Sequence, residues 1–461
     1  MRLTEKLQLF LAPAKVTCDQ SKELAEIDRI LNELPDKKFV LEQILKDVTG
    51  RTASKTGRDG VSAEQILKLG LLRKRHSLTY RGLAQATGDS LSMRNFLNLP
   101  MDERLSKSAI QGNLKAVKDS TWELLQKQIA EYAKQKNIES GEAIRGDCTT
   151  VETNIHHPTD ASLLNDVVRV LCRNMMRASE IIGAQVHYED RSCRAKARLF
   201  KINNTHNEEK RRPQYLELIR VTRETIGFAK EMLPILATYT SGDLMTDLQI
   251  QLIESELKTY IPRGENVIDQ AYRRIVLEER VPAADKIVSI FEEHTDIIVK
   301  GFRDAAFGHK VVLTTGRSAL ILDLQILDGN PKDSTLVPGL FERVKKKTGR
   351  TPIAAAFDGC FASTANRDLA KEAGVEELTF SKNGSMDLGS LVSSPKLHKA
   401  LKNFRAGVEG CISFAKRIFG FSRVFDKSLE TFKAALQLGA AAYNLTMLAR
   451  INCAAQKAQY G

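Results

Sequence analysis

The order of helical and strand-like patterns constrains the fold of this chain more than any other feature. Strand character is confined to residues 143–154 (AIRGDCTTVETN), to two stretches either side of a turn within 309–328, and to residues 352–358 (PIAAAFD). Helical patterns fill most of the remainder, including residues 160–300. This order predicts an α/β core that a long helical insertion interrupts.

The region before the first strand pattern is helical. Amphipathic patterns occupy residues 1–50, and a polar, glycine-containing hinge follows at 50–60 (GRTASKTGRDG). At the other end of this region, residues 108–136 are expected to form one long connecting helix.

Three short helices are expected between the hinge and the connecting helix. The first two span 61–74 and 77–87, with Gly88 ending the second, and the third begins at Ser90. Two short helices joined through a glycine in a basic window are typical of a helix-turn-helix. The same pattern equally fits a small three-helix bundle.

Positive charge is concentrated in two windows. The chain of 461 residues has a formal net charge of +12, and residues 51–100 and 191–220 each contain nine Lys/Arg against three Asp/Glu. The two windows therefore account for the whole net charge. Separate basic patches predict two contacts with a polyanion, with nucleic acid as the leading candidate; an acidic membrane surface would attract the same patches.

Other signals predict a soluble cytoplasmic protein. The longest uncharged run, residues 434–449, contains three polar residues and is shorter than the roughly 20 apolar residues that span a bilayer. The N-terminus lacks the apolar core of a signal peptide. The seven cysteines include no CxxC pair, which indicates reduced thiols and no zinc site.

Two aspartates occupy strand positions from which their side chains are expected to meet at the edge of a sheet. Asp147 lies within the first strand pattern, and Asp358 ends the pattern at 352–358. Carboxylates on neighbouring strands can converge on a divalent ion at the edge of a sheet, and Mg²⁺ or Mn²⁺ prefers such oxygen ligands. Asp323 and Asp328, on or just after another strand, are alternative second acids. We favour Asp358 because it ends an apolar strand.

A third acid is placed between two bases on a helix. In LKNFRAGVEGCISFAKRIFG, Arg405, Glu409 and Lys416 occupy positions i, i+4 and i+11, so all three share one helical face. An acid flanked by bases suits a site where the acid holds metal and the bases hold phosphate. An ordinary surface salt bridge has the same spacing, and Gly407 and Gly410 weaken the helix prediction.

The same segment resembles the signature of DDE transposases from bacterial insertion sequences. In that signature Arg, Glu and Lys are separated by three and then six residues, as here, and a tyrosine usually stands where this chain has Lys402. Three further stretches resemble the ISNCY-type group of these enzymes: RGDCTTVETNIHHPTDASLL, FGHKVVLTTGRSALILDLQILDGNPKDSTL and AAFDGCFAS. The segment ILKLGLLRKRHSLTYRGLAQATGDSLSMRNF resembles the N-terminal domain that many of them carry.

The resemblance implies an RNase H-like catalytic core, a mixed sheet with flanking helices that follows an all-helical N-terminal DNA-binding region. Asp147, Asp358 and Glu409 would hold Mg²⁺ or Mn²⁺ at one edge of the sheet, and Arg405 and Lys416 would contact phosphate. The implied regions are a helical segment and hinge over 1–60, a helical DNA-binding domain with the connecting helix over 61–140, a catalytic domain over 141–160 and 301–461, and a helical insertion over 161–300.

The implied activity is cleavage of double-stranded DNA at element ends, followed by strand transfer into target DNA. Both steps are direct displacements at phosphorus, so no covalent protein intermediate is expected. The resemblance also implies a homodimer, at least when DNA is bound, and a location on the bacterial nucleoid.

Candidate DNA contacts come from the two basic windows. Either set can instead be a solvated helix surface. The candidates are Arg73, Lys74, Arg75, Arg81, Arg94, Arg191, Arg194, Lys196, Arg198 and Lys201.

Two other functions would leave a similar pattern. A DNA-binding descendant of a transposase would keep the basic patches, but it would have no need of three acids with flanking bases. A metal-dependent nuclease would keep the acids and yield nicked but unjoined DNA. The chain has neither a GxGxxG nor a GxxxxGK[ST] phosphate loop, so an enzyme built on a nucleotide cofactor is not expected.

Overall fold

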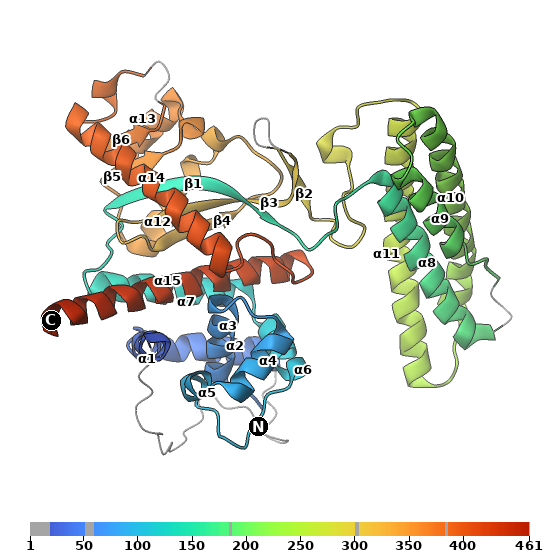
Figure 1. Cartoon of the computed structure of the whole chain (residues 1–461), viewed down its shortest axis with the longest axis horizontal. Coiled ribbons are helices and arrows are strands. Elements are labelled where there is room, and N and C mark those ends of the chain that lie inside the picture. The colour runs from blue at the N-terminus through green and yellow to red at the C-terminus, as the bar shows by residue number, and fades with distance from the viewer. Residues whose placement is uncertain (1–18, 51–59, 184–186, 300–303, 383–385, 461) are drawn as a thin grey trace. The chain divides into compact units, whose positions relative to one another are not determined.

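The computed structural model describes residues 19–50, 60–183, 187–299, 304–382 and 386–460 (Figure 1). They divide into two compact units. The core unit comprises residues 1–154 and 298–461, and the helical unit comprises residues 155–297.

The described residues before the first strand form short helices with clear caps. Ser62, Thr79 and Ser90 each accept a backbone N–H with the side chain at the start of a helix, which satisfies a donor that the helix leaves unpaired. The helices are α1 (Asp19–Asn32), α2 (Lys37–Thr49), α3 (Ala63–Arg75), α4 (Tyr80–Asp89), α5 (Leu91–Leu97), α6 (Lys107–Ala116) and α7 (Asp119–Gln135).

Two predicted boundaries in this region were wrong. Gly88 lies inside α4, which continues to Asp89 because Ser90 ends it and caps α5 directly. The single helix expected at 108–136 is two helices, α6 and α7. The chain is extended at Val117, and the N–H of Lys118 donates to the carboxylate of Asp47 on α2 (3.0 Å) in place of a helical bond.

The strands form one mixed sheet in the order β2–β3–β1–β5–β6, with β4 also paired to β3. β1 is antiparallel to β3 and parallel to β5, and β5 is parallel to β6. The predicted strands are present, and β2 and β6 are two further strands that were not predicted. The strands are β1 (Ala143–Glu152), β2 (Asp296–Ile298), β3 (Ala306–Thr315), β4 (Ile321–Ile326), β5 (Ala354–Phe357) and β6 (Glu377–Phe380).

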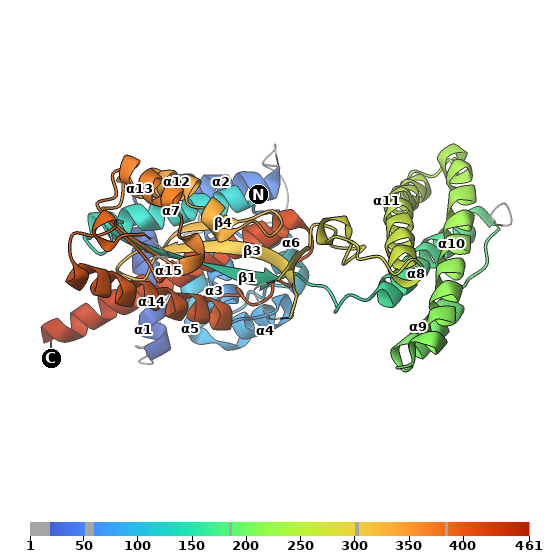
Figure 2. The same ribbon diagram turned by 90° about the horizontal axis from the view of Figure 1, so that it is seen from above.

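Helices cover both faces of the sheet. α12 (Pro338–Thr348) and α14 (Pro395–Ile418) lie on opposite sides of it (Figure 2). On the α12 side, Phe341 packs edge-on against Phe357 of β5, with ring centroids 6.1 Å apart. α14 crosses β1, β3, β5 and β6 on the other side. α13 (Thr364–Glu372) connects β5 to β6.

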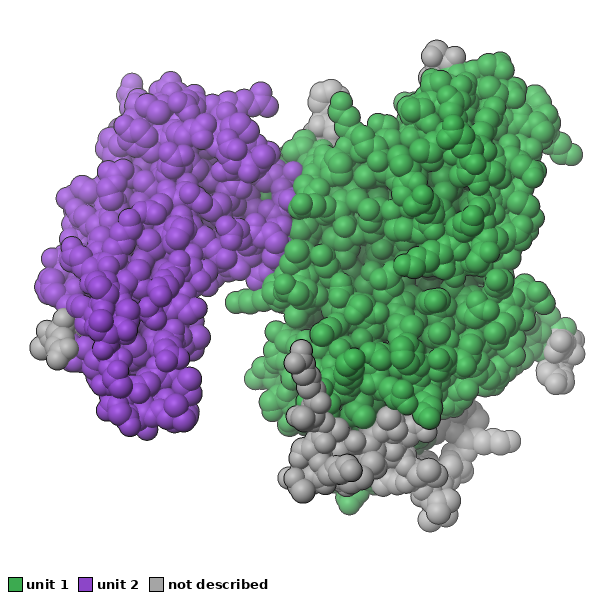
Figure 3. All heavy atoms as spheres, turned by 180° about the vertical axis from the view of Figure 1, so that it is seen from behind, with its two compact units in different colours: residues 1–154, 298–461 green, residues 155–297 purple. Residues whose placement is uncertain are grey.

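The helical unit is coloured purple in Figure 3. It has its own apolar core, to which four helices of the described residues contribute. The helices are α8 (Asp160–Ile182), α9 (Ser192–Asn203), α10 (Glu208–Thr238) and α11 (Leu244–Ile275). Each helix buries an amphipathic stripe, and α8 also buries Asp160, which pairs with Arg274 of α11.

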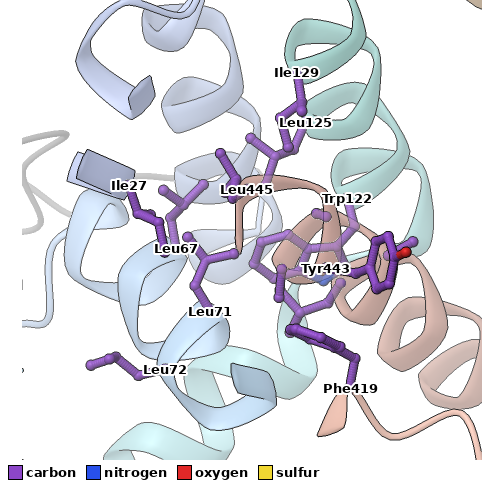
Figure 4. Packing of buried hydrophobic residues seen from close by; sticks show 14 of the residues in the cluster. Ile27, Leu67, Leu71, Leu72, Trp122, Leu125, Ile129, Phe419, Tyr443 and Leu445 are labelled. Atoms are coloured by element: carbon purple, nitrogen blue, oxygen red, sulfur yellow. The ribbon is translucent and has the colours of Figure 1, made fainter. Parts of the chain in front are cut away.

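α15 (Leu429–Tyr460) is the buried centre of the core unit. Tyr443 and Leu445 lie among Trp122 of α7 and Leu67 and Leu71 of α3 (Figure 4). The uncharged run at 434–449 is therefore apolar because it packs against the N-terminal helices. None of the helices in the described ranges has the length and apolar character to cross a bilayer.

Arg145 joins β1 to α14. Its side chain is buried and donates to Thr315 Oγ1 of β3 (3.0 Å) and to the carbonyl oxygen of Phe404 on α14 (2.7 Å). Its guanidinium also covers the Phe404 ring, 4.7 Å from the centroid. A Cβ at Gly407 would come within 2.0 Å of Arg145 Nη1. Gly407, which weakened the helix prediction, is therefore the residue that lets α14 approach β1.

Gly407 and Gly410 form a matched pair for testing this contact, because a Cβ at Gly410 would meet no atom within 4 Å. Alanine at 410 should stabilise α14 by up to about 1 kcal/mol through helix propensity. Alanine at 407 should displace the Arg145 guanidinium and cost about 1–3 kcal/mol. Urea unfolding followed by the fluorescence of Trp122, the chain's one tryptophan, reports on the core unit. Equal unfolding midpoints for the two variants would contradict this role of Gly407.

Candidate active site

Asp147 and Asp358 emerge side by side from neighbouring strands. β1 pairs in parallel with β5, and Gly146 lies opposite Phe357. Asp147 directly follows Gly146, and Asp358 directly follows Phe357. Arg145 and Asp147 are two residues apart on β1, so both project toward α14.

The guanidinium of Arg405 binds all three predicted acids. Its Nη2 lies 2.9 Å from Asp147 Oδ2 and 3.3 Å from Asp358 Oδ1, while its Nη1 lies 2.8 Å from Glu409 Oε1. The acids come from β1, from the end of β5 and from α14, which crosses these strands (Figure 1). Tertiary structure thus brings together four of the five residues expected at the catalytic site.

The side chains of the cluster differ in how far they are exposed to solvent. The exposed fraction of the side chain rises from 13% at Arg405 and 18% at Asp147 to 35% at Asp358 and 65% at Glu409. A ligand can therefore approach from the Glu409 side, while the two aspartates are held in the wall. Because three carboxylates surround one guanidinium, the cluster has an excess of negative charge.

Backbone and side-chain donors orient the two aspartates. Asp147 Oδ1 accepts the N–H of Cys148 (2.7 Å), and Asp358 Oδ1 accepts the hydroxyl of Ser381 (2.7 Å). Ser381 directly follows β6, and its hydroxyl oxygen accepts the N–H of Gly359 (2.8 Å). Ser381 therefore fixes both the carboxylate and the backbone at the end of β5.

The donor atoms of this cluster are of the kind that a hard divalent cation prefers, since all three acids offer carboxylate oxygens. In the described ranges, however, no group of three or more His, Cys, Asp or Glu side chains is arranged to hold a metal ion. The reason is visible in the contacts, because each of the three carboxylates directs an oxygen to Arg405.

The alternative second acids lie elsewhere. Asp323 is fully buried and faces two cations of α12, with Oδ2 2.9 Å from Arg343 Nε and Oδ1 2.9 Å from Lys347 Nζ. Lys347 Nζ also lies 3.3 Å from Glu123 Oε1, so two acids and two bases meet there. Asp328 is exposed in the loop after β4.

Lys416 lies further along α14, beyond Glu409. Seven residues of helix place it about 10 Å along α14 from Glu409. There it lines a separate pocket together with Arg73 and Lys74 of α3.

Several basic residues of the first window take part in the fold. Arg73 binds the carboxylate of Asp426, and Arg75 pairs with Glu23. Arg94 is 3% exposed and donates to backbone carbonyl oxygens on either side of α5, so its guanidinium holds the turn after that helix instead of facing solvent. Arg81 is exposed on α4.

The arginines of the second window pair with acidic or polar groups of the helical unit. Their partners are Glu189 and Glu224 for Arg191, Glu217 for Arg194 and Gln214 for Arg198. Lys196 and Lys201 are exposed on α9. Much of the positive charge that the sequence places in this window is therefore neutralised locally.

Two positioning residues, Arg145 and Ser381, were missed from the sequence. Arg145 had a usable signal, because it lies two residues from Asp147 and so shares its face of the strand. Ser381 had none, because it follows a four-residue strand that no pattern revealed.

Comparison with known families bears on the N-terminal helices. Residues 16–112 match the family model described as Transposase domain (DUF772). This match supports a transposase family and a transposase role for the chain, and a transposase acts on DNA. Searches of curated proteins and of solved structures gave no significant match.

The matched region and the carboxylate cluster are different parts of the core unit. The match includes α1 to α5 and the first turns of α6, and it ends before β1. The family match and the geometry around Arg405 are therefore independent observations.

Asparagine substitutions at Asp323 and Asp358 should show which of the two acids stabilises the fold. Asp323→Asn should destabilise the core unit by roughly 2–3 kcal/mol, because two cations lose a buried partner; the cost stays below that of a fully buried pair because Arg343 is 30% exposed. Asp358→Asn should cost less than about 1 kcal/mol, since Arg405 keeps two other carboxylates. Urea unfolding followed by Trp122 fluorescence measures the free energy of unfolding of each variant. A larger loss of stability in Asp358→Asn than in Asp323→Asn would contradict these roles.

Proposed function

We propose that the chain is a DDE-type transposase that cuts DNA at element ends and joins the 3′ ends to target DNA. The observation that carries this proposal is the convergence of Asp147, Asp358 and Glu409 on one guanidinium from three separate elements. The mixed sheet with β1 at its centre supports an RNase H-like core for this site. The transposase-domain match supports DNA as the substrate.

The charge balance of the cluster supports a metal-binding role. Three carboxylates lie beside the Arg405 guanidinium, and like charges this close repel one another. Asp323 differs, because it is fully buried and each of its carboxylate oxygens faces a separate cation, Arg343 or Lys347. A divalent cation is the ligand that would complete the cluster around Arg405.

Asp147, Asp358 and Glu409 would hold Mg²⁺ or Mn²⁺. Bound there, the metal would supply activation of the attacking oxygen and stabilisation of the leaving oxygen. Since Arg405 occupies the same carboxylate oxygens, its guanidinium would have to move aside. A DNA phosphate is a suitable new partner, because guanidinium groups bind phosphate through paired hydrogen bonds.

Joining two element ends requires at least two catalytic sites, so we propose a homodimer as the DNA-bound form. Asp147 and Asp358 would position the reacting phosphate from the wall of the site. Glu409, the most exposed of the three acids, would face the incoming strand.

Strand transfer in vitro tests the proposal. Purified full-length protein is incubated with Mg²⁺ or Mn²⁺, labelled element-end DNA and a supercoiled plasmid. Joined product is expected from the wild type, and loss of at least about a hundredfold is expected for Asp147→Asn, Asp358→Asn and Glu409→Gln, by analogy with removing a group that stabilises charge in a transition state. Glu372→Gln, an exposed acid on α13, serves as the control and should retain activity.

The products distinguish this proposal from its rivals. Nicked DNA without joined species would indicate a nuclease. Tight end binding with neither product would indicate a DNA-binding protein that descends from a transposase. Equal activity of wild type and all three acid variants would exclude this cluster as the catalytic site.

Competition between Arg405 and a metal gives a second prediction. Arg405→Ala should bind Mn²⁺ more tightly than wild type in the absence of DNA, because the carboxylates lose the cation that occupies them. Arg367→Ala removes an arginine from the Asp368 pair elsewhere in the core unit and is the control. Electron paramagnetic resonance of free Mn²⁺ measures binding without reference to catalysis. Unchanged Mn²⁺ affinity in Arg405→Ala would refute the competition.

A further inference from the structure

The first half of α11 is apolar on the side that faces solvent. Its buried side, which includes Ile253 and Leu257, packs in the core of the helical unit. Four large apolar side chains lie on the opposite side and are 49–73% exposed: Leu244, Met245, Leu248 and Leu252. We call these four side chains the α11 outer face. An amphipathic helix normally presents polar residues to water, so this face is expected to have a partner.

The outer face also lacks charge. At about 100° per residue, Gln251, Ser255 and Thr259 point in the same direction as the four apolar side chains. Over Leu244–Thr259, all of which the structure describes, the charged side chains lie on the flanks of this face: Asp247, Glu254, Glu256 and Lys258. The face therefore offers no cation to a phosphate, whereas an apolar partner can cover it without burying a charge.

The spacing of the leucines makes the face complementary to itself. Leu244, Leu248 and Leu252 recur every four residues, so the stripe is symmetric about Leu248. When two copies of α11 cross antiparallel at that point, Leu248 meets its counterpart, and Leu244 of one copy meets Leu252 of the other. Such a contact is related by a twofold axis, so it closes on two copies and does not propagate.

The charges of two copies in this register do not clash. Glu254 is already paired with Lys258 of its own helix (2.7 Å). Each carboxylate of the stretch would lie opposite an uncharged residue of the second copy: Asp243 opposite Ile253, Asp247 opposite Gln249, Glu254 opposite Gly242 and Glu256 opposite Thr240. Like charges that face each other across an interface would oppose association, and this arrangement avoids them.

The outer face is remote from the point where α8 begins. Asp160 is the first residue of α8, and its Oδ1 accepts a hydrogen bond from Gln270 of α11 (2.8 Å). Leu248 precedes Gln270 by 22 residues, which is about 33 Å along the helix. A substitution at Leu248 therefore leaves the contacts of Asp160 unchanged.

We propose that the α11 outer face binds the same face of a second copy of the chain, in an antiparallel contact centred on Leu248. The proposal rests on the DNA-bound homodimer proposed above and gives that homodimer a surface. The surface belongs to the helical unit, so the long insertion between β1 and β3 would act as a dimerisation element.

The size of the face predicts a weak dimer. A fully buried leucine side chain removes roughly 120 Å² from water, so the exposed parts of the four side chains amount to roughly 300 Å² per copy. Stable interfaces bury about 800 Å² on each partner. The contact alone should therefore depend on protein concentration, whereas two copies held on one DNA gain a high effective concentration.

Sedimentation equilibrium of the full-length protein, from about 1 to 200 µM without DNA or metal, tests the contact. The wild type should show a reversible monomer–dimer equilibrium. Leu248→Glu places two charges face to face in the dimer and should raise the dissociation constant at least about a hundredfold. Leu216→Glu is the matched control, because this leucine of α10 has a similar exposure (43% against 49%), and it should keep the wild-type constant.

A wild type that stays monomeric over this range would overturn the proposal. Equal dissociation constants for Leu248→Glu and the wild type would do the same. Leu252→Gln replaces an apolar side chain of the face by a polar one without adding charge, and it should weaken the dimer about tenfold. It provides a second variant if Leu248→Glu does not fold.

Cysteine substitutions test the register. An oxidised equal mixture of Leu244→Cys and Leu252→Cys proteins, tagged to differ in mass, should form a disulfide-linked heterodimer, because the antiparallel contact places these two positions together. Neither protein alone should cross-link above the wild type, which measures the background from exposed cysteines such as Cys193. Cross-linking of each variant with itself but not with the other would overturn the antiparallel contact.

Two further outcomes separate this proposal from others. If the wild type sediments with phosphatidylcholine vesicles, Leu248→Glu does not, and both are monomeric in solution, the face belongs to a lipid surface and the proposal is overturned. Dimerisation that Leu248→Glu abolishes, in a wild type without strand transfer, would leave the contact standing and remove the transposase mechanism. Strand transfer by a wild type that is monomeric in sedimentation would keep the mechanism and overturn the contact.

Discussion

The docking of α14 on β1 through Arg145 is the interaction on which the candidate site depends. α14 carries Arg405 and Glu409, whereas Asp147 and Asp358 belong to the sheet, so the four meet only if the helix has one position on the strands. Arg145 sets that position by bonding a helix carbonyl oxygen from within the sheet. A buried guanidinium with fixed partners is a stringent constraint, because any shift of the helix leaves its donors unpaired.

Charge balance distinguishes the roles of chemically similar residues. Asp323 lies within β4 and Asp358 directly follows β5, yet Asp323 is buried beside two cations of α12, whereas Asp358 is partly exposed and is one of three acids around Arg405.

The elements that carry the carboxylates are also joined to the N-terminal helices, because the hydroxyl of Ser77 after α3 donates to the carbonyl oxygen of Ile418 on α14. β1 and the chain after α14 are joined as well, because the loop at Ser422 and Val424 pairs with the end of β1.

The sequence by itself determined local features of this protein. It predicted β1, the hairpin and β5, and the spacing of Arg405 and Glu409 on one helical face, because backbone periodicity and side-chain direction are set by neighbours in the chain. Only the tertiary structure decided which charges meet. It placed Lys416 beside α3, used Arg94 to hold a turn, and made Gly407 the point where Arg145 reaches α14. The first and last of these contacts join residues hundreds of positions apart, and the energies of all three depend on burial and on partners that no local pattern contains.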